Sequence, residues 1–197
     1  MLTIKDLFDL DHTIAKDYLA QFTYPWEALA GIKDFILSVG PTLEDYDEVS
    51  PQVWVHKTAT VAPTAFLGGP CIIGPETEVR HCAFIRGSAL VGAGCVVGNS
   101  VELKNVILFD GVQTPHYNYV GDSILGYKSH MGAGSITSNV KSDKLPVVVR
   151  CGDERIDTGR KKVGAMLGDF VEVGCNSVLN PGSVIGRHSI IYPTSCV

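Results

Sequence analysis

The segment from Val101 to Asn139 holds the side chain best suited to acid–base chemistry in this 197-residue chain. His116 follows Pro115 in a stretch where a six-residue pattern of apolar residues, regular up to Phe109, fails. We expect the chain to leave its regular path there, so that the His116 side chain projects from the surface. An imidazole can take up a proton near neutral pH. His116 is therefore a candidate general base, with an ordinary surface-loop histidine as the alternative interpretation.

Residues 140–166 form a second segment that breaks the six-residue pattern, and they hold seven of the chain's sixteen lysine and arginine residues. These seven are Lys141, Lys144, Arg150, Arg155, Arg160, Lys161 and Lys162. Acidic residues are interspersed among them, so a solvated loop with partly paired charges is one interpretation. A basic arm over an active site is the other. The stretches VVVR and ERID on either side of Gly152 predict a small β-hairpin.

A six-residue repeat must position these side chains. Every sixth residue from Val55 to Phe109 is large and apolar, and the fourth residue after each is usually small or β-branched. The pattern returns at Leu167 in a new phase. A chain with this period turns a corner every six residues, and it buries its core only by stacking coil upon coil. The sequence predicts a mainly β protein, with a parallel β-helix of hexapeptide repeats over residues 55–197 and one protruding loop at 140–166.

Residues 1–54 are expected to form a small helical segment ahead of the repeat. Apolar residues recur at helical spacing within 14–22 and again within 29–39. Residues 44–48 are mostly acidic and predict a solvated linker. Because the open end of a solenoid exposes apolar surface and strand edges, we expect the helices to cover one end of the coils.

The composition limits the classes of function. A net charge of −5 argues against non-specific nucleic-acid binding. The first residues lack a signal-peptide pattern, and no apolar run approaches the roughly 20 residues that span a bilayer. The six cysteines are scattered without CxxC spacing, so we expect reduced, mostly buried thiols. A cytoplasmic protein with neither nucleic-acid nor membrane partners is predicted.

Several stretches resemble a known family. GNSVELKN, HYNYVGDSILG and MGAGSITSN are similar to the acetyltransferase domain of the bifunctional N-acetylglucosamine-1-phosphate uridyltransferase/glucosamine-1-phosphate acetyltransferase family, which are left-handed β-helix acyltransferases. GRKKVGAMLGD resembles the archaeal-type sugar-phosphate nucleotidyltransferase/acyltransferase form of that family. The resemblance spans residues 55–197. It implies left-handed winding and a homotrimer with active sites between subunits.

The resemblance also implies an activity, namely acetyl-CoA-dependent N-acetyl transfer to an amino-sugar phosphate similar to glucosamine 1-phosphate, as in UDP-N-acetylglucosamine biosynthesis. His116 matches the catalytic base that frees the substrate amine to attack the thioester, and Asn139 matches an asparagine that helps to stabilise the oxyanion. The positions matched to substrate binding are Arg86, Lys104, Tyr119, His130 and Lys144. The positions near coenzyme A are Ala133, Gly134 and Cys175. The basic arm would lie over the active site or over the phosphates of coenzyme A, and the transfer itself requires no metal.

Two positions depart from the family pattern. His130 stands where the family has an asparagine that contacts the substrate. Leu145 stands where the family has a substrate-binding lysine, with Lys144 one position away. For Arg86 and Lys104, an exposed charge on the coil surface is the alternative interpretation. Acetyl transfer is therefore better supported than the identity of the acceptor sugar.

Other functions compete with this hypothesis. No glycine-rich nucleotide-binding fingerprint precedes the repeat, so no nucleotidyltransferase domain is expected in this chain. A zinc hydratase of the carbonic-anhydrase type also uses hexapeptide coils, but it needs about three histidine ligands. His81 and His116 lie about two coils apart, and Asp122 and His130 are the nearest substitutes for a third ligand. A non-catalytic or differently specific solenoid is the remaining alternative, favoured by the departures at His130 and Leu145.

Overall fold

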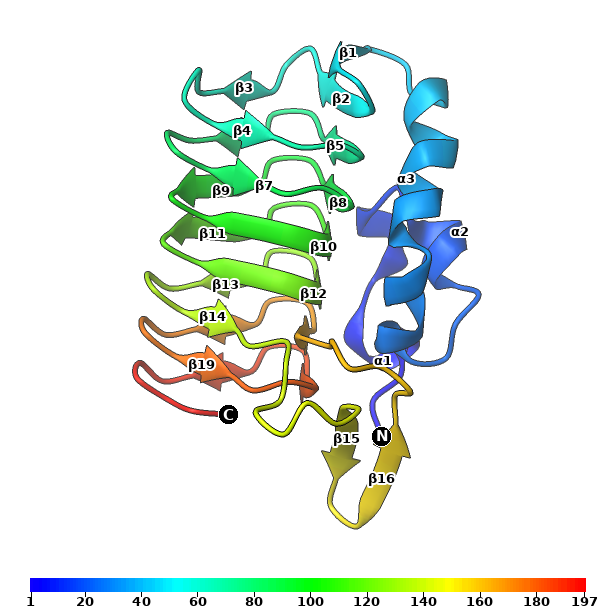
Figure 1. The fold of residues 1–197 in the computed structure, drawn as a ribbon, viewed down its shortest axis with the longest axis vertical. Coiled ribbons are helices and arrows are strands. Elements are labelled where there is room, and N and C mark those ends of the chain that lie inside the picture. The colour runs from blue at the N-terminus through cyan, green and yellow to red at the C-terminus, as the bar shows by residue number, and fades with distance from the viewer.

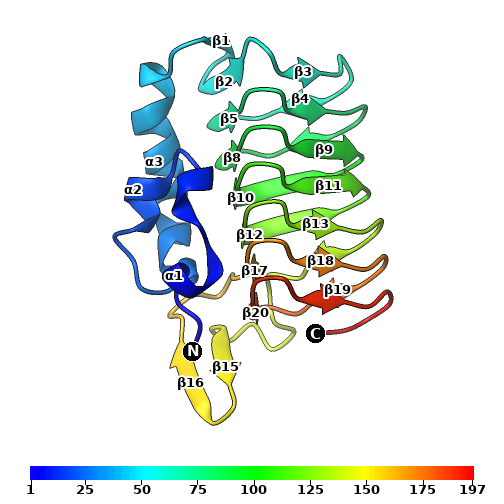
Figure 2. The same cartoon turned by 180° about the vertical axis from the view of Figure 1, so that it is seen from behind.

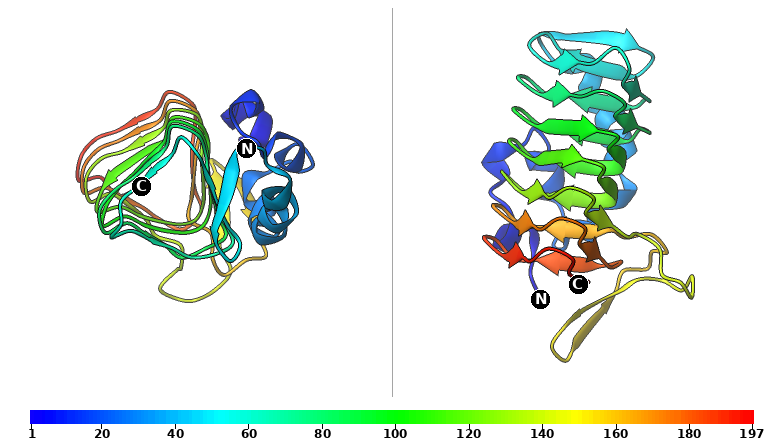
Figure 3. Two further views of the ribbon diagram at one scale, coloured as in Figure 1. Left: turned by 90° about the horizontal axis from the view of Figure 1, so that it is seen from above. Right: turned by 90° about the vertical axis from the view of Figure 1, so that its left-hand side faces the viewer.

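The structure is a computed structural model that describes residues 1–197. Its coils stack along one axis into a β-solenoid, and the helices lie alongside (Figures 1 and 2). Seen along the axis, each coil is roughly triangular (Figure 3, left). The mainly β, hexapeptide-repeat β-helix predicted from the sequence is therefore confirmed. The N-terminal helices and the coils share one hydrophobic core, so the molecule is a single packed unit.

Each side of the triangle is a stack of short parallel strands, here called face one, face two and face three in chain order. Face one is a seven-stranded sheet of β3 (Thr60–Val61), β6 (Glu78–Val79), β9 (Val96–Asn99), β11 (Gln113–His116), β13 (His130–Met131), β18 (Glu172–Val173) and β21 (Ile190–Ile191). A twelve-stranded sheet forms the other two faces. Face two contains β4 (Phe66–Leu67), β7 (Phe84–Ile85), the first residues of β10 (Glu102–Leu108) and β12 (Tyr119–Leu125), β14 (Ile136–Thr137) and β19 (Val178–Leu179). Face three contains β1 (Tyr46–Ser50), β2 (Val53–His56), β5 (Cys71–Ile73), β8 (Ala89–Val91), the last residues of β10 and β12, β17 (Ala165–Leu167) and β20 (Ser183–Ile185).

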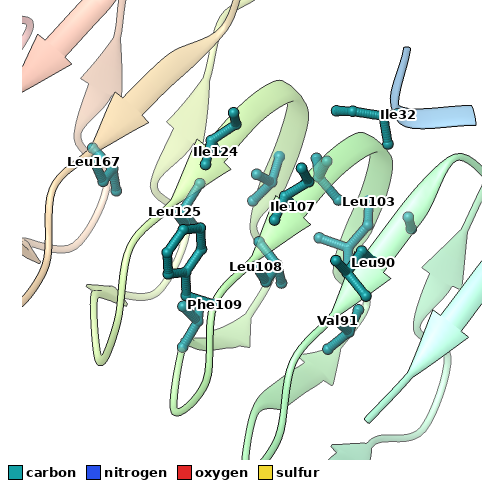
Figure 4. Packing of buried hydrophobic residues seen from close by; sticks show 14 of the residues in the cluster. Ile32, Leu90, Val91, Leu103, Ile107, Leu108, Phe109, Ile124, Leu125 and Leu167 are labelled. Atoms are coloured by element: carbon teal, nitrogen blue, oxygen red, sulfur yellow. The ribbon is translucent and has the colours of Figure 1, made fainter. Parts of the chain in front are cut away.

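Face three is apolar on both of its sides. Its strands read as continuous apolar runs, in contrast to the alternating pattern of the other faces, and a strand covered on both sides has that pattern. Successive side chains point to opposite sides of a strand. Ile72, Leu90 and Ile107 pair with one another in register on face three and point away from the coil interior. All three are at most 1% exposed. Figure 4 shows Leu90 and Ile107 near Ile32 of the N-terminal segment.

The N-terminal segment supplies that cover. Its helices are α1 (Ile4–Leu7), α2 (Lys16–Leu19) and α3 (Ile32–Val39), with 3₁₀ turns η1 (Leu10–His12), η2 (Pro25–Ala30) and η3 (Gly40–Thr42). The helices run along face three (Figure 3, left), so the prediction that they cover one end of the coils was wrong. The physical reason is that the outward side of face three is apolar, so the helices bury it in the shared core. The acidic residues 44–48 also differ from a simple linker, because Tyr46–Ser50 forms strand β1, exposed and antiparallel to β2.

The break in the repeat has a different cause from the predicted one. Gln113–His116 is a regular strand of face one, paired in parallel with β9 and β13, and the chain makes no excursion there. Leu103 pairs with Ile85, eighteen residues earlier, whereas Val106 pairs with Ala89, seventeen residues earlier. One residue is therefore missing at the Lys104–Asn105 corner. The next coil keeps the seventeen-residue spacing, because β12 follows β10 in register.

The structure also bears on the predicted hairpin and on the predicted state of the cysteines. The hairpin around Gly152 is confirmed as β15 (Val148–Cys151) paired with β16 (Glu154–Asp157), and it protrudes from the coils (Figures 1 and 3). The six cysteines are free thiols as expected, but only Cys71 and Cys95 are buried, so the expectation of mostly buried thiols was wrong. Four thiols lie at turns and on the loop, where the side chain faces solvent. None of the helices has the length and apolar character needed to cross a membrane.

Candidate active site

Asp122 lies at the centre of a polar cluster on the shortened corner between faces two and three. Its carboxylate is 2% exposed and accepts hydrogen bonds from Lys104 Nζ at 3.0 and 3.1 Å. It also accepts from Asn105 Nδ2 at 2.9 Å and from Asn139 Nδ2 at 2.6 Å. Three donors from the two neighbouring corners thus offset the cost of burying one charge. We call Lys104, Asn105, Tyr119, Asp122 and Asn139 the Asp122 cluster.

The amide of Asn139 has a fixed orientation in this cluster. A carboxylate only accepts, so the NH₂ end of the amide must face Asp122. The same nitrogen donates to the Tyr119 hydroxyl at 3.1 Å, which uses its second proton. The Asn139 side-chain oxygen remains free to accept a hydrogen bond from a ligand. Within the chain, both protons of the Asn139 amide are thus engaged, and its match to the family asparagine near the oxyanion stays a prediction.

Tyr119 lies over the backbone of the same strand. A Cβ at Gly121 would lie 2.4 Å from the Tyr119 hydroxyl, so only glycine leaves room for the phenol there. Burial raises the pKa of the Tyr119 phenol, and the nearby Asp122 and Glu102 carboxylates raise it further. The phenol is therefore protonated at neutral pH, and its proton is available to a ligand oxygen.

Arg86 extends the cluster by one coil. It follows β7, and its Nη1 donates to Glu102 Oε1 at 2.7 Å. That contact with Glu102 raises the pKa of Arg86 and keeps the guanidinium charged. Both side chains are partly exposed, so the pair contributes little to stability. Its effect is to place a cation beside Tyr119.

His116 ends β11 at the other edge of face two, at the corner with face one. The side chain is exposed, and no hydrogen bond within the chain engages its ring. Its backbone is fixed more firmly. A Cβ at Gly98 would lie 1.6 Å from the Pro115 carbonyl oxygen, so the strands approach too closely there for any other residue. The His116 amide donates to the buried Asn118 side chain at 3.2 Å. The imidazole is therefore an exposed group on a rigid strand.

The residues matched to coenzyme A form the next coils of the same corner. Gly134 N donates to the His116 carbonyl at 3.0 Å, and Asn176 N donates to the Ala133 carbonyl at 2.9 Å. In the register of β13 and β18, Ala133 lies beside Cys175, whose side chain is exposed. The structure thus brings His116, Ala133, Gly134 and Cys175 into one row.

Two of the predicted substrate residues lie elsewhere. His130 is on face one, where its Nδ1 lies 2.8 Å from Glu172 Oε2. It lines a pocket of 250 Å³ with Cys175, so it is beside the cofactor row and not the Asp122 cluster. Lys144 is exposed in the segment after Asn139, with no ion pair. Within one chain neither residue contacts Lys104 or Tyr119, and their match to substrate-binding positions stays a prediction.

The basic loop returns to the Asp122 cluster. A pocket of 560 Å³ is lined by Lys104, Asn105 and Asp122 of the cluster, by Leu29 and Ala30 of η2, and by Gly159, Arg160, Lys161 and Lys162. Part of the predicted basic arm therefore lies beside the candidate site. Lys141 and Arg150 line a separate pocket of 480 Å³ under the loop.

Sequence reasoning missed the organising roles of Asp122 and Asn118. Asp122 was considered only as a substitute zinc ligand, whereas its contacts are all with nitrogen donors. Asn118 donates to Gly132 O, Ser135 O and Ser135 Oγ, tying the strand of His116 to the turn at Ala133. One signal was present in the sequence, namely the spacing of seventeen residues between Asn105 and Asp122. In the structure both residues lie at corners and have positive φ. No group of three or more His, Cys, Asp or Glu side chains is arranged to hold a metal ion, and His81, His116 and His130 do not converge.

The coils and this site define a hexapeptide-repeat β-helix protein. A family model described as the GMPPB C-terminal domain matches residues 67–190, which is more than half of the chain. The chain belongs to this family.

The similar proteins agree with the resemblance seen in the sequence. A bifunctional sugar-1-phosphate nucleotidylyltransferase/acetyltransferase of Sulfurisphaera tokodaii is 37% identical over 94 residues, covering 48% of this chain and 23% of that protein. A bifunctional protein GlmU of Methanococcus maripaludis is 32% identical over 180 residues, covering 89% of this chain and 44% of that protein. The chain thus spans less than half the length of these relatives. Among solved structures, the acetyltransferase domain of PglB from Neisseria gonorrhoeae, in complex with acetyl coenzyme A, has 17% identity and a TM-score of 0.35, covering 68% of this chain and 53% of that one.

Proposed function

We propose that the protein is an acetyl-CoA-dependent N-acetyltransferase that acts on an amino-sugar phosphate similar to glucosamine 1-phosphate. The observation that supports it most is the position of His116. Its unengaged imidazole lies in one row with the Ala133–Gly134 turn, and the Asp122 cluster lies across face two on the same coils. A base, a turn for the cofactor and a cationic substrate site thus lie on the same coils, the first two at one edge of face two and the last at the other.

The chemistry follows from these groups. His116 accepts a proton from the substrate ammonium, and the freed amine forms a bond to the thioester carbonyl carbon. The carbonyl oxygen becomes an oxyanion, which collapses as the carbon–sulfur bond breaks. The thiolate of coenzyme A leaves and takes up the second proton that the attacking nitrogen loses, so that the products are an N-acetyl amide and free coenzyme A. Asn139 accepts a hydrogen bond from the sugar through its free oxygen, while Lys104 and Arg86 attract the phosphate.

The same proposal covers the setting of the reaction. The protein assembles as a homotrimer with sites between subunits and works in the cytoplasm on small molecules. It carries out the acetyl-transfer step of UDP-N-acetylglucosamine biosynthesis. The name of the Sulfurisphaera tokodaii relative supports this assignment, since it combines sugar-1-phosphate nucleotidylyl transfer with acetyl transfer.

A thiol-release assay with acetyl-CoA and glucosamine 1-phosphate tests the proposal. Turnover by wild type is expected to fall by about 10²–10⁴-fold in His116→Ala, the usual loss when a general base is removed. The melting temperature should stay unchanged, because the side chain is exposed. His81→Ala removes an exposed histidine two coils away and should leave turnover intact. Undiminished turnover in His116→Ala would exclude this base, and no turnover on a panel of amino-sugar phosphates would favour a non-catalytic solenoid.

A further inference from the structure

The pocket beside the Asp122 cluster gathers positive charge in a chain whose net charge is −5. Four of its lining residues are cationic: Lys104, Arg160, Lys161 and Lys162. The one carboxylate in the lining is Asp122, and its oxygens already accept from Lys104, Asn105 and Asn139. Lys104 is paired with Asp122, whereas the other three cations have no acidic partner within ion-pair distance. Charge of this sign, left unpaired in one pocket, fits an anion.

The segment that brings these cations is held at both ends. Val163 N donates to the Asn139 carbonyl at 3.1 Å, and Gly164 N donates to the Asp122 carbonyl at 2.8 Å. Lys162 forms a backbone bridge with Val140, and the Arg160 carbonyl accepts from Val147 N at 2.8 Å. The backbone of the cationic segment is therefore attached to the same corners that hold the Asp122 cluster. Such attachment lowers the cost of ordering long side chains around a ligand.

Arg160 gives an independent indication of an absent partner. Its Nε is buried and donates to no atom of the chain. A buried donor without a partner is costly, and native structures rarely keep one without reason. Leu29 and Ala30 of η2 also line the pocket, and Asn105 Nδ2 donates to the Leu29 carbonyl at 3.2 Å. The pocket is thus built from three parts of the chain.

We propose that Arg160, Lys161 and Lys162 form, together with Lys104, a binding pocket for a phosphate group. The inference rests on the proposed function for the source of that phosphate, which is the amino-sugar phosphate or coenzyme A. These cations would take the role of the family's substrate-binding lysine, whose position is occupied by Leu145 in this chain, next to Lys144. Guanidinium and ammonium groups bind phosphate oxygens through charge-assisted hydrogen bonds, and arginine does so through two parallel donors.

Calorimetry with inorganic pyrophosphate tests the pocket without any turnover. The wild-type chain should bind pyrophosphate, and Lys161→Gln/Lys162→Gln should bind at least about tenfold more weakly, because two charge-assisted contacts are lost. The control Lys33→Gln/Arg155→Gln removes the same two charges from exposed positions outside the pocket and should bind as wild type does. Equal binding by all three proteins, or none by wild type, would overturn the proposal.

Steady-state kinetics then identifies the source of the phosphate. If the pocket holds the acceptor, the double variant raises KM for glucosamine 1-phosphate by about tenfold or more and leaves KM for acetyl-CoA unchanged. If it holds coenzyme A, the reverse is expected. Unchanged KM values for both substrates would reject the pocket while the transfer reaction stands. Loss of pyrophosphate binding in a chain that shows no transfer at all would retain the pocket and reject the reaction.

Discussion

Asp122 shows how one buried carboxylate can organise a surface site. Its side chain is buried, yet each group that donates to it is only partly buried. Lys104 and Asn139 are each held through a side-chain nitrogen that donates to this carboxylate. These contacts come from three consecutive coils, so the stacking of the solenoid itself sets the geometry. Asp122 is therefore a positioning residue, acting through Lys104 and Asn139.

Replacing Asp122 by asparagine should disrupt this arrangement. Lys104 would lose its counter-charge, and the new NH₂ group would face donors on Lys104, Asn105 or Asn139. We expect the free energy of unfolding to fall by about 1–3 kcal/mol, as for an unsatisfied buried donor. The value of kcat/KM should fall more than tenfold, mainly through KM for the amino sugar. Thermal denaturation and the thiol-release assay measure the two effects.

Asn105→Ala is the matched comparison for Asp122→Asn. It removes one donor to the same carboxylate but leaves Lys104 and Asn139 bonded to it. Its effect on KM should be several-fold smaller. If both substitutions changed KM equally, Asp122 would contribute to folding only, and its positioning role would be wrong.

Sequence reasoning found the chemical groups of the site but not their connections. Lys104, Tyr119 and Asn139 were identified by motif match, and the structure joins them through Asp122. The match could not give the orientation of the Asn139 amide, because that depends on a carboxylate from the neighbouring coil. It also could not show that, within one chain, His130 on β13 and Lys104 on β10 lie on different faces. A linear motif records order along the chain, whereas a solenoid places neighbours seventeen or eighteen residues apart.

At the scale of elements, the two shortened coils explain why the phase of the repeat changes. The period predicted the coils because each strand needs inward apolar side chains. It could not distinguish a loop from the loss of one residue, since either change shifts the next apolar position. The loss has a structural result: β10 and β12 run through the corner as seven-residue strands. The polar side chains of successive corners are thereby brought within hydrogen-bond distance.

The N-terminal helices should be essential to the stability of the coils. Ile36 of α3 is fully buried in the core that the helices share with face three. Ile36→Ala removes three carbons from that contact and should lower the free energy of unfolding by about 2–5 kcal/mol. Denaturant titration measures the change. KM for both substrates should stay at the wild-type value, because α3 lines no part of the candidate site.

Lys33→Ala on the exposed side of the same helix serves as the comparison. Its effect on stability should stay within about 0.5 kcal/mol, as is usual for surface positions. If Ile36→Ala behaved like Lys33→Ala, the helices would be an appendage and not part of the fold. A single cooperative transition in both proteins is expected, since one core spans helices and coils.

At the scale of the whole molecule, the helices leave two faces of the triangle uncovered. On the uncovered side, Phe66 and Phe84 are 60% and 43% exposed, and their ring centroids lie 5.6 Å apart on face two. Tyr117, at the corner beside His116, is 63% exposed. Adjacent exposed aromatic side chains are typical of interfaces between proteins. The family resemblance implies that the partner is two further copies of the chain.

Light scattering coupled to size exclusion should therefore give three times the chain mass of 21.1 kDa. Phe84→Glu places a charge among the rings of face two and should shift the mass towards that of one chain. Because Phe84 is partly exposed, the new charge should not unfold the chain, and the circular dichroism spectrum should be unchanged. Because the proposed sites lie between subunits, the variant should lose acetyl transfer together with its assembly. Glu78→Ala, at an exposed position on face one, should remain trimeric. A wild-type monomer with full turnover would contradict the shared site and require that a single chain supplies every catalytic group.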